Sequence, residues 1–142
     1  MRVLAAPDKF RGTASAAEVA AAVSRAVAAY GGTTTELPMA DGGEGLLDVL
    51  GGPDRISTVI GPLGEPVDVG WRLSEGTAVI EMAQVAGLAL AGGPDQNRPL
   101  DATTAGVGEL LRQAVESGAR RVIVGVGGSA TTDGGLGALE AM

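Results

Sequence analysis

The sequence predicts an α/β fold in which parallel-sheet strand–glycine loop–helix units, of the flavodoxin-like or Rossmann-like kind, accompany a three-stranded antiparallel meander. Short apolar or β-branched runs at 3–6, 33–37 and 122–126 are each followed by a glycine-containing loop and a helical pattern. Between 55 and 82, three strand-like runs are instead separated by turn residues. The change of pattern near 52–54 predicts a βαβα unit over 1–53. Residues 54–142 are predicted to form the meander, then a helix, a strand, a glycine-rich loop and a helix start.

The composition narrows the classes of function. The chain has 142 residues, 45% of them hydrophobic, which suits a globular protein with a real core. Cysteine and histidine are absent, so disulfides, thiolate metal sites and Ser-His-Asp catalysis within this chain are excluded. A net charge of −7 disfavours nucleic acid as a partner. No run is long enough to span a membrane and no signal peptide is recognisable, so we expect a cytoplasmic protein that binds small molecules.

The first predicted strand, 3–6, leads into a charged loop over 7–12 that carries Asp8, Lys9 and Arg11. In open α/β sheets, ligands bind at the carboxyl ends of strands, so this loop is a candidate site. Ser15 and Glu18 then form a capping-box pattern that predicts the start of a helix. Gly31 and Gly32 are expected to end that helix.

The second predicted strand, 33–37, precedes a glycine-rich turn and a helical face over 46–50. Asp41 and Glu44 stand in this turn. Carboxylates there could cap the helix, because its dipole favours negative charge. They could equally hold Mg²⁺, which prefers oxygen ligands. The residues alone leave both interpretations open.

The middle of the chain contains the predicted meander, with strands at 56–60, 67–73 and 77–82 and Trp71 on one face. Residues 83–90 fit either a short helix or a buried loop. A loop over 92–99 follows, in which Arg98 could bind a ligand or simply pair with a nearby aspartate, Asp95 or Asp101. Thr103 and Thr104 can cap the next helix, which Gly118 is expected to end.

The loop over 125–135 is the strongest candidate for a functional site. It joins a buried strand to a helix start and contains five glycines, hydroxyl side chains and Asp133. Backbone N–H groups at the positive end of a helix form a site for an anion such as phosphate. The alternative is a tight connection whose glycines only permit positive φ. The spacing Gly125-x-Gly127-x-x-Ala130 also fits the dinucleotide pattern G-x-G-x-x-A weakly, and no Walker A motif is present.

Together these parts are the ones that phosphoryl transfer needs: donors around phosphate, cations, and carboxylates to orient a hydroxyl or hold a metal. Arg11 and Arg98 supply cations, and Asp8, Asp41 and Asp133 supply carboxylates. If these groups converge, they lie on one side of the fold at strand ends. The alternative is a non-catalytic nucleotide- or small-acid-binding α/β module, which would keep the glycine loops without that convergence.

Four motifs, in order, resemble the bacterial glycerate kinase family. They are 6–12 (APDKFRG), 39–45 (MADGGEG), 97–99 with 103–110 (NRP and TTAGVGEL) and 127–135 (GGSATTDGG). The resemblance implies a two-domain α/β enzyme with an interdomain active site, which transfers the γ-phosphate of ATP to glycerate with Mg²⁺. Lys9, Arg11 and Thr132 depart from the residues common in the family. Members of the family are also more than twice as long, so we expect this chain to be an amino-terminal portion that acts within a longer chain.

The resemblance also implies roles for individual residues. The catalytic carboxylate is Asp133 or Asp8, and Asp41 with Glu44 is the candidate for Mg²⁺. Substrate binding falls to cationic and amide side chains: Arg98, Asn97, Lys9 and Arg11. Phosphate binding falls to the last motif: Gly127, Gly128, Ser129, Thr131, Thr132 and Gly134.

Overall fold

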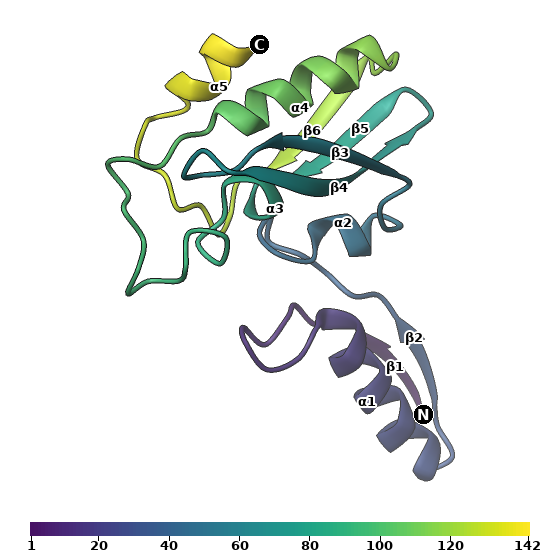
Figure 1. Cartoon of the computed structure of the whole chain (residues 1–142). Helices are drawn as coiled ribbons and strands as arrows, with labels where there is room; N and C mark the ends of the chain where they lie inside the picture. The colour runs from purple at the N-terminus through teal and green to yellow at the C-terminus, as the bar shows by residue number, and fades with distance from the viewer. The chain divides into compact units, whose positions relative to one another are not determined.

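The computed structural model describes all residues, 1–142, and has a mixed α/β fold, which confirms the predicted class at that level (Figure 1). It contains two compact units, Met1–Asp41 and Gly42–Met142, and each is described here by itself. The sequence predicted the change near 52–54. The structure divides earlier because α2 (Leu46–Val49) contacts β5 (Thr77–Glu81) and so joins the second unit.

The first unit is a β–α–β arrangement of β1 (Arg2–Ala5), α1 (Ala16–Ala29) and β2 (Thr33–Glu36). The two strands are parallel, with Arg2 opposite Thr33. The predicted capping box of α1 is confirmed: Glu18 N donates to Ser15 Oγ at 3.2 Å and Ser15 N donates to Glu18 Oε2 at 2.8 Å. These bonds satisfy N–H groups that have no partner inside the helix, so they fix where α1 begins.

The second unit is built on a four-stranded sheet with the order β3-β4-β5-β6. β3 (Arg55–Ile60) is antiparallel to β4 (Pro66–Ser74), and β4 is antiparallel to β5. β6 (Arg121–Gly125) is parallel to β5, and α4 (Ala105–Glu116) lies between them in the chain. The strand predicted at 122–126 is thus β6, and a β–α–β connection through α4 pairs it with β5.

The core of the second unit lies where α4 packs against the sheet. Val69, Ile80, Leu110 and Ala114 have no exposed surface. Trp71 belongs to this core with 2% exposure, and its indole N–H donates to Ser57 Oγ at 3.0 Å. The aliphatic side chains and this tryptophan give the sheet and α4 their common apolar contact.

Two further short helices flank the core. Residues 83–90, which fitted a helix or a loop, contain one helical turn, α3 (Ala83–Ala86), whose apolar side chains are buried. The chain ends with α5 (Leu136–Ala141), in which Leu136 and Leu139 are 57% and 70% exposed. No helix of the structure has the length and apolar character needed to cross a membrane.

Candidate functional site

The loop that carries Arg98 is joined to the 125–135 loop. Asn97 Nδ2 donates to the carbonyl of Ala130 at 3.1 Å, and Thr132 Oγ1 donates to the carbonyl of Pro99 at 2.7 Å. Two hydrogen bonds therefore join segments that lie about thirty positions apart in the sequence.

Arg98 lies between these two anchors with its side chain 63% exposed. Its Nη1 is 3.6 Å from Asp101 Oδ2, so the ion pair considered from the sequence is present. Both partners face water, where such a pair contributes little, and the guanidinium can exchange this partner for another anion. The Oδ1 atom of the neighbouring Asn97 is buried and has no hydrogen-bond partner.

The 125–135 loop has a small hydroxyl network and several N–H groups without protein acceptors. Ser129 Oγ is 2.9 Å from Thr131 Oγ1 and accepts from Thr131 N at 3.1 Å. The backbone N–H groups of Gly128, Ser129, Thr132 and Gly134 donate to no protein atom. Neighbouring N–H groups in such a turn can surround an anion.

Four hydrogen bonds hold the carboxylate of Asp133. Its Oδ2 accepts from Thr104 N at 2.8 Å, from Thr104 Oγ1 at 2.7 Å and from Gly137 N at 3.3 Å. Its Oδ1 accepts from Gly135 N at 3.1 Å. Thr104 Oγ1 in turn accepts from Ala138 N at 3.0 Å. We call this set of bonds the Asp133 clasp; it ties the start of α4 to the start of α5.

The clasp also sets the protonation of Asp133. Partial burial alone would raise the pKa of this carboxyl, but the hydrogen bonds from Thr104, Gly135 and Gly137 together outweigh it and hold the pKa below its ordinary value. Asp133 is therefore ionised at neutral pH. A carboxylate with a lowered pKa is a weaker proton acceptor than one poised near the operating pH.

The second glycine-rich turn, 42–45, is held by a residue that the sequence patterns missed. Glu81, at the end of β5, is 3% exposed. Gly45 N donates to both oxygens of its carboxylate, at 3.2 Å each, and Leu47 N donates to Oε2 at 3.1 Å. The N–H groups of Gly45, in this turn, and of Leu47, just after it, thus donate to the protein's own carboxylate. One signal could have found it: Glu81 is the only charged residue in the apolar run 78–83.

The first unit brings together other predicted residues. Lys9 Nζ lies 3.2 Å from Asp41 Oδ1, and the lysine side chain is only 15% exposed. Asp8 Oδ1 accepts from Lys9 N at 2.7 Å. Arg11 is exposed in the same loop. The loop after β1 and the segment after β2 therefore meet at the carboxyl ends of two parallel strands, where ligands bind in such sheets.

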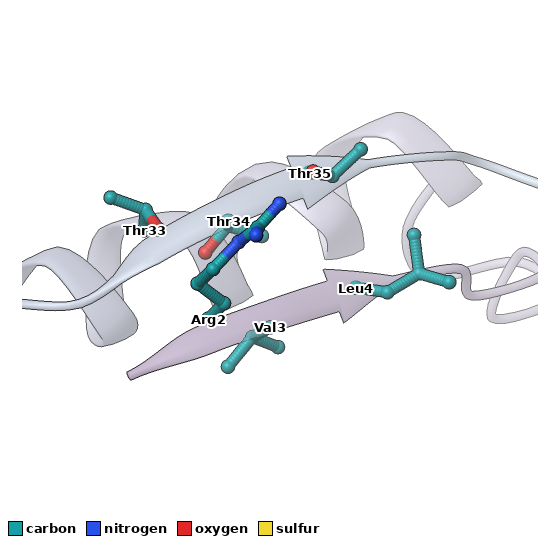
Figure 2. Close-up of a pocket in the computed structure, with 6 residues that line it drawn as sticks. All are labelled: Arg2, Val3, Leu4, Thr33, Thr34 and Thr35. Atoms are coloured by element: carbon teal, nitrogen blue, oxygen red, sulfur yellow. The ribbon is translucent and has the colours of Figure 1, made fainter.

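A surface pocket of about 470 Å³ also lies in the first unit (Figure 2). Figure 2 shows Arg2 extending from β1 toward the threonines of β2. The lining comes from the two strands alone: Arg2, Val3, Leu4, Thr33, Thr34 and Thr35. None of the predicted site residues contributes to it, so we do not assign the candidate site to this pocket.

Comparison with known proteins decides the family. The model of the glycerate kinase family matches residues 3–142. The chain belongs to the glycerate kinase family. It is 45% identical to a glycerate kinase of Bacillus subtilis (strain 168) over 150 residues, covering 100% of this chain and 39% of that protein. It is 43% identical to a glycerate 2-kinase of Escherichia coli (strain K12) over 155 residues, again covering 100% of this chain and 39% of the relative.

A solved structure agrees with this membership. The chain superposes on a crystal structure assigned to glycerate kinase 2 of Salmonella typhimurium LT2 with a TM-score of 0.81 and 39% sequence identity. The match covers 99% of this chain and 40% of the other. This glycerate kinase family chain therefore spans about two fifths of the length of the relatives that it matches.

The structure bears on the predicted metal ligands only in part. No group of three or more acidic, histidine or cysteine side chains could hold a metal ion. Mg²⁺ in phosphoryl-transfer sites commonly uses one or two carboxylates together with phosphate oxygens, so a site with few protein ligands fits its chemistry. Asp41 and Glu44 belong to different compact units, and their role as a pair stays a prediction.

Proposed function

We propose that this chain forms part of a glycerate kinase that catalyses ATP-dependent phosphoryl transfer to a hydroxyl of glycerate, and that the activity requires a longer chain. The observation that carries the proposal is the junction of the 97–99 and 125–135 loops. It sets an exposed guanidinium, Arg98, on a surface shared with four N–H groups that have no protein acceptor. An exposed guanidinium suits a carboxylate, and such N–H groups suit a phosphate.

We assign the binding roles on this basis. Arg98 holds the glycerate carboxylate through its planar fork. Asn97 is assigned to the same substrate site, where its amide joins the Arg98 loop to the carbonyl of Ala130. Lys9 and Arg11 supply further positive charge from the first unit. The phosphate groups are held by the glycine and hydroxyl residues of the last motif: Gly127, Gly128, Ser129, Thr131, Thr132 and Gly134.

The catalytic carboxylate is Asp8 or Asp133, and the hydrogen bonds favour Asp8. Only one bond, from Lys9 N, reaches the carboxylate of Asp8, whereas four donors occupy that of Asp133. Asp8 therefore retains acceptor capacity to orient an attacking hydroxyl. Bound Mg²⁺ would neutralise charge on the phosphates, and Asp41 with Glu44 are the carboxylates that would hold it.

We further propose that the β1–α1–β2 unit is one parallel layer of a flavodoxin-like or Rossmann-like domain, and that β3, β4 and β5 form the meander of a second domain. The parallel register of β1 and β2 and the antiparallel registers of β3–β4 and β4–β5 support this assignment. An enzyme of two such domains is what the resemblance to the family implies.

The alternative is a non-catalytic nucleotide- or small-acid-binding module. One observation counts against its dinucleotide version. The G-x-G-x-x-A pattern works when the glycine turn opens a helix directly, so that the helix N-terminus receives the pyrophosphate. Here Ala130 donates its N–H to the carbonyl of Ala86, and α5 begins only at Leu136.

A thermal-shift screen of the 142-residue chain tests the proposal. Ligands that bind only the folded state stabilise it, by about 2.7 kcal/mol at one hundred times their Kd. We expect stabilisation by ATP–Mg²⁺ and by D-glycerate and none by NAD. Stabilisation by NAD alone would favour the binding-module alternative and contradict the kinase assignment.

A further inference from the structure

Glu81 is a buried acidic side chain that the proposed chemistry does not use. It ends β5 with 3% exposure, next to Ile80, which has none, and no lysine or arginine pairs with it. Burying a carboxylate is unfavourable unless hydrogen bonds or a cation compensate. The compensation here is the set of N–H groups of Gly45 and Leu47. The carboxylate and the 42–47 segment therefore hold each other in place.

The 42–47 segment in turn supports the 125–135 loop. Gly127 N donates to the carbonyl of Gly42 at 3.0 Å. The backbones approach so closely that a Cβ on Gly127 would lie 2.5 Å from Gly43 Cα, and one on Gly125 would lie 2.5 Å from the Gly42 carbonyl oxygen. No side chain fits between the two segments, so a displacement of one must move the other.

The sheet closes this set of contacts. Glu81 is the parallel-register partner of Gly125, and Met82 N donates to the Gly125 carbonyl at 2.9 Å. A closed set of contacts thus joins four parts of this unit: the end of β5, the end of β6, the 42–47 segment and the start of the 125–135 loop. Glu81 is the one charged side chain in this set that bonds to a separate segment, since it accepts from residues 45 and 47 and not from a neighbouring strand.

We propose that Glu81 is a positioning residue for the phosphate-binding loop. Through Gly45 and Leu47 it fixes Gly42 and Gly43, and these fix Gly127 and hence the free N–H groups of Gly128 and Ser129. This inference rests on the proposed phosphate-binding role of the 127–134 residues. The role of Glu81 in holding Gly127 can be measured separately from that function.

The test is Glu81→Gln in the 142-residue chain, followed by amide hydrogen exchange and by titration with inorganic phosphate in NMR spectra. Glutamine keeps the shape but turns one acceptor into a donor that faces N–H groups. We expect exchange at Gly45, Leu47 and Gly127 to become at least about tenfold faster, while the core amides of Val69 and Leu110 change little. Phosphate should bind about tenfold more weakly, which is the smallest effect seen when residues that support metal ligands are replaced.

Glu116→Gln is the matched control, because it removes the same charge from a side chain that is 68% exposed and forms only a 4.0 Å ion pair with Arg112. It should leave both measurements unchanged. A general loss of stability in Glu81→Gln would accelerate the core amides equally, and this result would overturn the positioning role. Unchanged exchange at Gly127 would also overturn it.

If wild-type protein shows no response to phosphate while Gly127 exchange is selectively faster in Glu81→Gln, the proposed function fails and the positioning stands. If Glu81→Gln does not fold, Gly125→Ala tests the same coupling in reverse. Its Cβ presses on the Gly42 carbonyl, so exchange at Gly45 and Leu47 should accelerate. Unaltered exchange at those two amides would overturn the inference.

Discussion

Replacing Asp133 by asparagine separates a structural carboxylate from a reactive one. In the most favourable orientation, the amide oxygen of the new side chain takes the place of Oδ2 and keeps the bonds from Thr104 and Gly137. The amide nitrogen then replaces Oδ1 and faces Gly135 N, donor against donor. The variant loses one hydrogen bond to a charged group and weakens the others.

The expected loss follows from these bonds. A hydrogen bond to a charged group contributes about 1.5–3 kcal/mol, and the site is partly open to water, so we expect the free energy of unfolding to fall by about 2 kcal/mol. Urea unfolding followed by tryptophan fluorescence measures it, because Trp71 is the only tryptophan and is buried in the same unit as the clasp. Asp95→Asn is the control, since Asp95 is exposed and makes no hydrogen bond or ion pair.

The pH dependence gives a second signature of the clasp. The pKa of Asp133 is lowered in the folded state. The stabilisation of the folded state by the ionised carboxylate is therefore fully present above the unfolded pKa of about 3.9 and is lost as the pH falls through the folded pKa. The difference in stability between wild type and Asp133→Asn should therefore be constant from about pH 5 to 7 and shrink below about pH 4.

The refuting result is equally specific. A reactive carboxylate would lose roughly 10²–10⁴ in kcat on this substitution while stability stayed nearly intact. If Asp133→Asn unfolds at the same urea concentration as wild type, the clasp does not stabilise this unit. Asp133 would then again be a candidate for the catalytic carboxylate.

The remaining predictions concern individual contacts. Ser15→Ala should reduce the stability of the first unit by about 1 kcal/mol, measured by circular dichroism, because it removes the cap of α1; Thr13→Ala should not, and an equal effect would contradict the cap. In a catalytically complete enzyme, Arg98→Lys should raise KM for glycerate, because an ammonium cannot replace the bidentate guanidinium fork. An unchanged KM and kcat would mean that Arg98 serves only in its ion pair with Asp101. Gly108→Ala should destabilise the packing of α4 on α5, because its Cβ would collide with the Ala138 carbonyl; unaltered urea unfolding would contradict this contact.

The local elements were predictable because their signals are local. Ser15 and Glu18 lie three positions apart, so one turn of sequence contains both halves of the cap. The short runs that became β1, β2 and the strands of the second unit were found within one or two residues of their observed bounds. In each case the pattern and the contacts that it predicts lie in the same few residues.

The partners of those elements were not predictable in the same way. The apolar run 122–126 predicted a buried strand but not the neighbour of that strand, which is β5. The choice of neighbour depends on the crossover through α4 and not on the strand itself. Asp133 was identified as a site residue, yet its partner Thr104 is 29 positions away. Glu81 was missed because its role depends on N–H groups 34 and 36 positions earlier.

The most direct test of the central claim is turnover by a chimera. Residues 1–142 would replace the aligned 39% of the Bacillus subtilis glycerate kinase, and ADP release would be followed with D-glycerate, ATP and Mg²⁺. The account predicts glycerate-dependent ADP release by the chimera, its loss in the chimera that carries Asp8→Asn, and none by the 142-residue chain alone. A folded chimera without glycerate-dependent ADP release would contradict the proposed function, and turnover by the isolated chain would contradict its need for a longer one.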